Sequence, residues 1–225
     1  MAIRKWHRCI QVWTSKNSTD RRYALCSPTA ALGKVDGVGL SLLPLLRLIA
    51  LGAQDRLTAN PIEFITRATG DWTLYFLCLT LAVTPLRRFT GVNDLIRFRR
   101  MLGLFTFFYA SLHFLAFIWF DHFFDVTEMM RDVLKRPFIA MGFSAFVLLV
   151  PLAMTSHDFM LRKLGRRWSM LHRLIYPIAI LAMLHFWWMR AGKNNFAEPL
   201  VMGAVVAMLL ALRLIWLRRD SLHRP

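Results

Sequence analysis

Residues 101–120 read MLGLFTFFYASLHFLAFIWF and contain no Lys, Arg, Asp or Glu. A helix that spans the hydrocarbon core of a bilayer needs about 20 mostly apolar residues. This stretch therefore predicts a transmembrane helix. It also contains a histidine, His113, and an ionisable side chain within the membrane is a functional candidate by default.

The composition of the whole chain agrees with a membrane protein. Apolar residues make up 56% of the 225 residues and charged residues 19%, against about 45–50% and 25% in soluble domains. This excludes disorder for the bulk of the chain. The net charge is +16. The basic residues lie between the apolar runs, which indicates loops against an anionic membrane surface rather than nucleic-acid binding.

Five further apolar segments accompany residues 101–120, and together they predict an all-α integral membrane protein with six transmembrane helices. The six segments are residues 38–52, 72–86, 101–120, 138–155, 174–189 and 199–217. We expect a transmembrane domain over residues 37–217, between a basic, disordered cytoplasmic tail (1–36) and a short cytoplasmic C-terminal tail (218–225). An organellar transit peptide is the alternative for residues 1–36, because they are basic, contain Ser and Thr and have few acids. No internal repeat is visible in the sequence.

The distribution of Lys and Arg predicts the orientation. Loops and tails on one side (1–37, 87–100, 156–167 and 213–225) contain 20 basic residues, and those on the other side contain 6. Because basic residues concentrate in cytoplasmic loops, both termini are predicted to be cytoplasmic.

Several motifs for binding metals and cofactors are absent from the sequence, which excludes the corresponding types of site. Cys9, Cys26 and Cys78 form no CxxC or CxxCH, which argues against an iron–sulfur cluster, a zinc finger and covalently attached haem. No nucleotide-binding glycine motif occurs either. If the chain moves electrons, it receives them from another molecule.

His113 and His185 interrupt apolar runs on two different predicted spans. They lie 13 residues after Arg100 and 18 residues after Arg167, roughly 20 and 27 Å along outward-running helices. Neutral imidazole is the commonest metal ligand, so two facing histidines in the outer half of the membrane can hold a haem iron from both sides. The alternative is a pair of hydrogen-bonded core histidines, and the shared depth favours ligation.

His172 lies near the cytoplasmic face, 13 residues before His185 on the same segment. An axial separation of roughly 20 Å suits a second, inner redox site, but no fourth histidine completes it. That site is incomplete, uses another ligand, or holds something else. Arg47 interrupts the first span, and two interpretations stay open: it snorkels to the interface, or it pairs with a haem propionate. His122 and His157 are expected to be interfacial residues rather than ligands.

Several motifs resemble one family. They are TPLRR at 84–88, RRMLGL at 99–104 followed by LH at 112–113, and RKLGRRW at 162–168 followed by LHRLIY at 171–176. In order and spacing they resemble the MsrQ (YedZ) family, which belongs to the ferric reductase-like transmembrane group. The likeness covers about residues 38–217.

The resemblance implies a six-span haem-binding bundle in the bacterial inner membrane. It implies b-type haem, one or two per chain, with ligands that correspond to His113, His172 and His185, and an association with FMN. It also implies electron transfer from a cytoplasmic flavin reductase or a quinol to MsrP, a periplasmic molybdopterin enzyme that reduces methionine sulfoxide in oxidised proteins. The family motifs assign no role to Arg47.

We therefore expect an electron-transfer subunit rather than an enzyme in its own right, with substrate reduction on the partner. A direct ferric or quinone reductase of the same fold is the alternative within redox chemistry. A small transporter with a polar path lined by His and Arg is the alternative from another class, and the lack of repeated broken helices argues against it.

Overall fold

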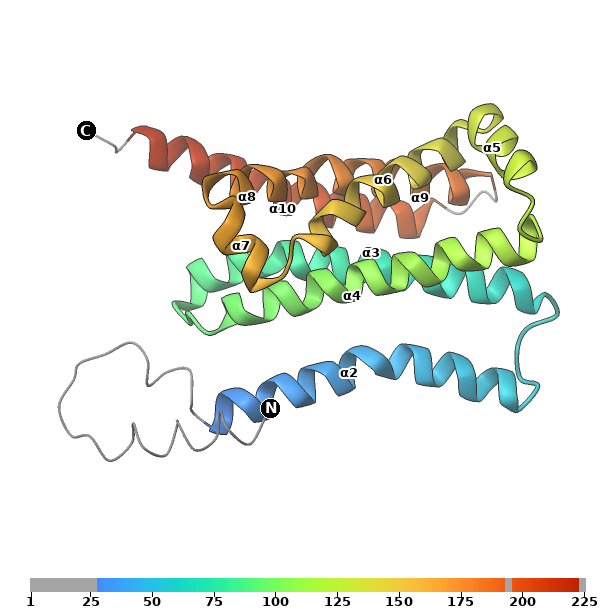
Figure 1. Ribbon diagram of the computed structural model, residues 1–225, viewed down its shortest axis with the longest axis horizontal. Helices are drawn as coiled ribbons and strands as arrows, with labels where there is room; N and C mark the ends of the chain where they lie inside the picture. The colour runs from blue at the N-terminus through green and yellow to red at the C-terminus, as the bar shows by residue number, and fades with distance from the viewer. Residues whose placement is uncertain (1–27, 193–195, 223–225) are drawn as a thin grey trace. The chain divides into compact units, whose positions relative to one another are not determined.

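The computed structural model describes residues 28–192 and 196–222, and each regular element within these ranges is a helix (Figure 1). The elements are α2 (Pro28–Ala53), α3 (Pro61–Thr90), α4 (Leu95–Ala116), η2 (Phe117–Asp121), α5 (Val126–Lys135), α6 (Pro137–Met154), α7 (Asp158–Leu164), α8 (Arg166–Leu171), η3 (His172–Leu174), α9 (Ile175–Ala191) and α10 (Ala197–Leu222). The all-helical prediction is confirmed for the described ranges.

The helices extend beyond the predicted domain limits. α2 begins at Pro28, so residues 28–36 of the predicted tail are helical, while residues 1–27 lie outside the described residues. α10 continues to Leu222 and includes the first residues of the predicted C-terminal tail. The chain divides into two units within α2, after Leu43, and α3 to α10 all belong to the second unit.

Within residues 28–192 and 196–222, five helical segments are long and apolar enough to cross a membrane. They are Asp36–Ala53, Leu95–Asp121, Pro137–Met154, Arg166–Ala191 and Ala197–Trp216. They coincide with five of the six predicted spans. The remaining segment, 72–86, lies within α3, which also carries charged residues such as Arg67 and Asp71. Its crossing of the membrane and the cytoplasmic position of the termini stay predictions.

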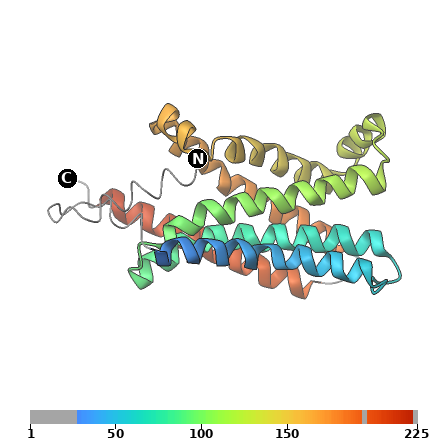
Figure 2. The ribbon, with the colours of Figure 1, turned by 60° about the horizontal axis from the view of Figure 1, so that its bottom comes forward.

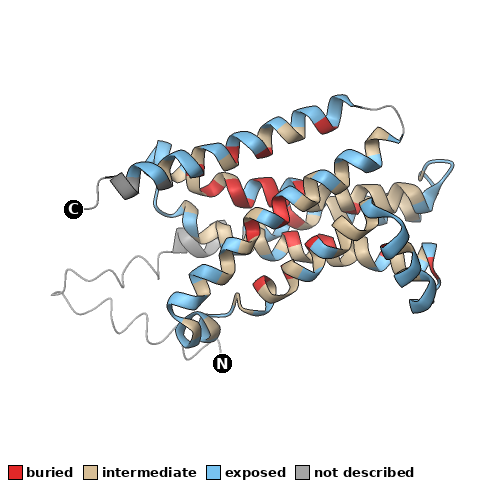
Figure 3. Cartoon of the chain, turned by 90° about the horizontal axis from the view of Figure 1, so that it is seen from above, coloured by how far each residue is buried: buried red, intermediate tan, exposed pale blue. Residues whose placement is uncertain are grey.

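The second unit is built around two helix pairs. α3 packs along α4, α6 packs along α9, and α10 contacts both α3 and α9 (Figures 1 and 2). Leu77 and Leu81 of α3 meet Ile178 and Ala179 of α9 in one apolar cluster. Buried residues lie on the inward sides of these helices, and the outward sides are largely exposed (Figure 3). Apolar side chains on the exposed faces are typical of helices surrounded by lipid.

A proline in α3 explains a buried arginine in α10. Pro85 has no backbone N–H, so the carbonyl of Leu81, four residues earlier, loses its partner within the helix. Arg213 of α10 is only 6% exposed, and its Nη2 donates a hydrogen bond of 2.7 Å to this carbonyl. The same guanidinium also donates to Thr84 Oγ1 and Tyr176 Oη. Arg213 thus joins α10 to α3 and α9 by satisfying a carbonyl that would otherwise be unpaired in an apolar interior.

Candidate functional site

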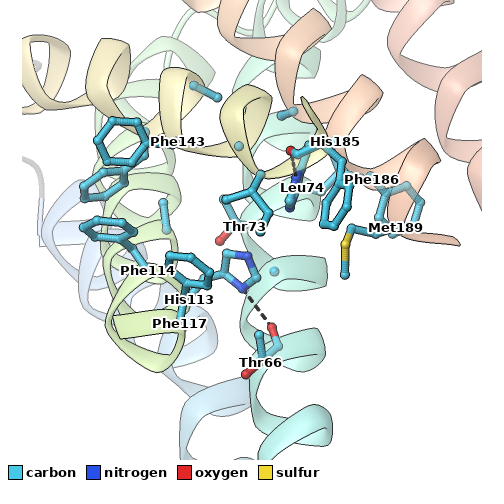
Figure 4. A pocket seen from close by; sticks show the side chains of 18 of the residues that line it. Thr66, Thr73, Leu74, His113, Phe114, Phe117, Phe143, His185, Phe186 and Met189 are labelled. Atoms are coloured by element: carbon cyan, nitrogen blue, oxygen red, sulfur yellow. Dashed lines mark hydrogen bonds between the residues drawn. The ribbon is translucent and has the colours of Figure 1, made fainter. Parts of the chain in front are cut away.

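A cavity of about 530 Å³ lies between α3, α4, α6 and α9. Its walls are mostly apolar and aromatic. Figure 4 shows Phe114, Phe117 and Phe143 on one side and Phe186 and Met189 on the other. Cofactor sites between the helices of a bundle are commonly apolar cavities of this size with few polar groups.

His113 and His185 enter this cavity from α4 and α9 (Figure 4). Their ring centres are 6.1 Å apart, and the ring planes are inclined at 71°. The structure therefore brings together two histidines that come from separate helix pairs. The closeness of these two rings agrees with the prediction that they face each other, and their role as ligands stays a prediction.

Each ring is oriented by a backbone carbonyl. The Nδ1 of His113 lies 2.8 Å from the carbonyl oxygen of Thr66, and the Nδ1 of His185 lies 2.7 Å from that of Phe138. A carbonyl only accepts hydrogen bonds, so Nδ1 carries the proton in both rings and Nε2 keeps its lone pair. Metal-binding histidines are typically held in this way, because the second hydrogen bond sets the tautomer and the ring orientation.

Two glycines provide the space for the rings. A Cβ atom on Gly70 would lie 3.1 Å from Nδ1 of His113, and one on Gly142 would lie 2.9 Å from Nδ1 of His185. Any larger side chain at Gly142 would force the imidazole of His185 to move. The glycines thus allow α3 and α6 to approach the rings closely enough for their carbonyls to accept.

The two halves of the site repeat the same arrangement. In both, the carbonyl precedes its histidine by 47 residues. In both, the glycine follows that carbonyl residue by four positions. No repeat is visible in the sequence, because only these few positions correspond.

The residues fit a metal ion bound between the two rings. A metal–imidazole bond is about 2 Å long and the nitrogen lies about 1 Å from the ring centre, so two ligands of one ion place their ring centres about 6 Å apart. The observed separation of 6.1 Å agrees with this value. Groups of three or more His, Cys, Asp and Glu side chains that could hold a metal do not occur among the described residues. The two histidines therefore suit a metal that brings its remaining ligands with it, as a porphyrin iron does.

Polar and charged side chains line the cavity near the beginnings of α3 and α6 and the ends of α4 and α9. The residues that line it there are Arg67, Asp71, Asp121, His122, Asp132, Arg136 and Arg190. We call this set the polar end. Arg190 of α9 contacts Asp71 of α3 at 3.1 Å and Glu198 of α10 at 3.1 Å. This ion-pair group connects three helices next to the histidine pair.

The other predicted site residues lie elsewhere. His172 does not line the cavity; its ring stacks on Trp168 at 3.9 Å, and its Nδ1 lies 3.1 Å from the Trp168 carbonyl oxygen. Arg47 is exposed on α2 and does not line the cavity either. The structure thus joins two of the four predicted residues in one site.

Sequence reasoning missed Gly70, Gly142 and the burial of His122. Glycines within a helical pattern indicate a close approach, and that signal was present for the first two. His122 was expected at the interface, but it is only 6% exposed and lines the cavity. Its burial depends on the turn that follows η2, and no motif in the sequence identifies that turn.

Comparisons with known proteins give the family. Residues 69–183 match the family model of the ferric reductase like transmembrane component. A protein-methionine-sulfoxide reductase heme-binding subunit MsrQ from Herminiimonas arsenicoxydans is 64% identical over 177 residues, which cover 78% of this chain and 81% of the relative. The MsrQ of Ralstonia nicotianae is 59% identical, with 81% and 84% covered, and that of Xanthomonas campestris is 50% identical, with 74% and 75% covered. The chain therefore belongs to the MsrQ family of ferric reductase-like transmembrane proteins.

Proposed function

We propose that this chain carries electrons across a membrane through a b-type haem whose iron is held by His113 and His185. The observation that carries the proposal is the matched histidine pair, with Nδ1 of both rings bound to backbone carbonyls and 6.1 Å between the ring centres. The relatives are named as heme-binding subunits of a methionine sulfoxide reductase, which supports the same conclusion.

The residues of the chain have distinct roles in this proposal. His113 and His185 donate Nε2 lone pairs, and the carbonyls of Thr66 and Phe138 hold the rings in place. With haem bound, the aromatic wall would exclude water and lower the local dielectric, which together with His113 and His185 would set the redox potential. The haem, when bound, supplies one-electron redox chemistry.

We propose further that the acceptor is a periplasmic MsrP-type molybdopterin enzyme and that methionine sulfoxide is reduced there. In the orientation predicted from the basic residues, residues 121–136, which supply Asp121, His122, Asp132 and Arg136 of the polar end, would lie outside the cytoplasm. The haem site would then lie near the side on which such a partner docks. The membrane would be the inner membrane of a bacterium.

The donor would be a cytoplasmic flavin reductase or a quinol, with FMN as an associated cofactor. The sequence contains no nucleotide-binding motif, and the basic cytoplasmic loop 87–100 is suited to an acidic donor or to a flavin phosphate. His172 would mark the inner site at which electrons enter, since it lies outside the cavity that holds the His113–His185 pair.

The test is the reduced-minus-oxidised absorption spectrum of the protein purified in detergent. Wild type is compared with His113→Ala, His185→Ala and, as a matched control, His157→Ala, which removes an exposed histidine outside the cavity. A b-type spectrum in wild type and the control, lost in both cavity variants, is the expected result.

Other outcomes contradict the proposal in different ways. A b-type signal that survives in both cavity variants would place the haem elsewhere. A protein without haem, even after expression with haem supplied, would rule out the electron carrier and favour a transporter. Flavin content of the same samples, measured by fluorescence after denaturation, tests the association with FMN.

A further inference from the structure

His122 is held inside the protein by an unusual backbone path. It follows the π-helical turn η2, and its carbonyl accepts a hydrogen bond of 2.8 Å from the backbone N–H of Asp125. The next two residues, Phe123 and Phe124, have positive φ angles of 45° and 66°, which are uncommon for bulky side chains. These two phenylalanines are exposed, whereas His122 is only 6% exposed. The turn thus directs the imidazole inward and the aromatic side chains outward.

The imidazole of His122 lacks hydrogen bonds. Both Nδ1 and Nε2 are buried, and neither has a hydrogen-bond partner within the described part of the chain. The Oδ2 of Asp132 lies 3.7 Å from Nε2, within range of an ion pair but too far for a hydrogen bond. Phe117 packs against the ring, with 4.6 Å between ring centres. Leaving a buried polar group without a partner is unfavourable, so a ligand for this side chain is expected.

His122 lines the same cavity as His113 and His185, at the polar end. The arginines of the polar end already contact carboxylates: Arg67 contacts Glu63 at 3.0 Å, Arg136 contacts Asp132 at 3.4 Å, and Arg190 is paired as described. His122 differs from these three arginines, because neither of its ring nitrogens forms a hydrogen bond within the described part of the chain.

We propose that His122 binds a carboxylate of the molecule that occupies the cavity, and this inference rests on the proposed function, in which that molecule is haem. The two carboxylates of haem cannot remain in the apolar part of the cavity, because an unpaired buried charge is strongly unfavourable. They must lie at the polar end. There an imidazole N–H of His122 donates to the carboxylate.

The spacing along the chain is consistent with this role. His122 follows His113 by nine residues, just after η2, and both side chains line the same cavity. His122 would act as a positioning residue that selects one rotation of the haem within the cavity, and it would not touch the iron.

The experiment compares haem with its dimethyl ester, in which both carboxylates are masked. The full chain is purified in detergent from cells grown without a haem supply and titrated with each compound. The variants are His122→Ala, His122→Gln, which retains a donor, and His157→Ala as a control at an exposed histidine outside the cavity. Binding is measured from the absorption change, and the far-ultraviolet dichroism of each variant checks its fold.

We expect His122→Ala to weaken the binding of haem about tenfold, because a hydrogen bond to a charged group is lost. The dimethyl ester should bind wild type and His122→Ala equally, and His122→Gln should recover part of the affinity for haem. An equal loss for both compounds would overturn the inference in favour of a structural role, and so would the absence of any loss. If neither compound binds to wild type, the proposed function itself fails.

Discussion

The ring centres of His113 and His185 lie 6.1 Å apart across the cavity, although the two residues belong to different helix pairs. Each ring is fixed by a carbonyl of the partner helix in its own pair, so the distance between them depends on how the pairs pack together. The α3–α4 pair and the α6–α9 pair each supply one ligand, one carbonyl and one glycine. Changes in these supporting residues should therefore affect the site without removing a ligand.

Replacement of Gly142 by alanine should reduce haem occupancy severalfold while both histidines remain. The new Cβ would lie 2.9 Å from Nδ1 of His185, so the ring must move and its bond to the Phe138 carbonyl weakens. Alanine otherwise stabilises a helix by about 0.5–1 kcal/mol relative to glycine. Haem per protein is measured by the pyridine haemochrome method. Gly103→Ala, whose Cβ would meet only Thr80 Cγ2 at 3.8 Å, is the control and should keep its haem.

Removal of Arg213 should destabilise the protein through the carbonyl of Leu81. Arg213→Met leaves that carbonyl without a partner, at a cost of about 1–3 kcal/mol, and the apparent melting temperature in detergent should fall by several degrees. Pro85→Ala restores a backbone N–H four residues after Leu81. In a Pro85→Ala protein, Arg213→Met should therefore lower the melting temperature by less than it does in the wild type. Equal costs in both backgrounds would show that the carbonyl is not the reason. Arg56→Met, at an exposed arginine, serves as control.

The contact between Asp71 and Arg190 should be worth more than a surface ion pair. The side chains are only 27% and 15% exposed, and Arg190 Nη2 donates to both oxygens of Asp71 at 3.1–3.2 Å. Asp71→Asn should lower the melting temperature and reduce haem occupancy, because Arg190 follows His185 by five residues on α9. The double variant Asp71→Arg, Arg190→Asp should recover part of the stability. The swap is made together with Glu198→Gln, because Glu198 also contacts Arg190 and would repel a carboxylate there. No recovery in that background would mean that geometry rather than charge decides this contact.

Replacement of His172 should leave haem bound at the proposed site between His113 and His185. The ring of His172 stacks on Trp168 and does not line the cavity. If His172 serves an inner redox site, the variant His172→Ala loses only one component of a potentiometric titration followed by absorption. Loss of all haem from this variant would contradict the separation of the two sites. Trp168→Leu removes the stacking partner and should alter the same component.

Much of the fold could be predicted from the sequence. The apolar runs, the lack of charge within 101–120 and the position of the basic loops indicate a helical membrane protein, because uncompensated charges are costly in lipid. The same cost singled out His113 and His185, since a polar side chain persists in such a run only where a partner awaits it. Residues 72–86 are the predicted span that does not coincide with one of the long apolar helices of the described ranges, and their helix, α3, also carries Arg67 and Asp71.

The tertiary structure decided which of the candidates meet. Neither the facing of His113 and His185 nor the closeness of Gly142 can be deduced from hydropathy, because the rotation of each helix about its axis is set by contacts with other helices. The burial of His122 depends on a turn with two residues at positive φ. Arg213 of α10 pairs with the Leu81 carbonyl, which lacks a partner because of Pro85 in α3. The sequence by itself thus determined the membrane-embedded helices and the residue types available for ligation, and only the packing of α3, α4, α6 and α9 determined which of them share one cavity.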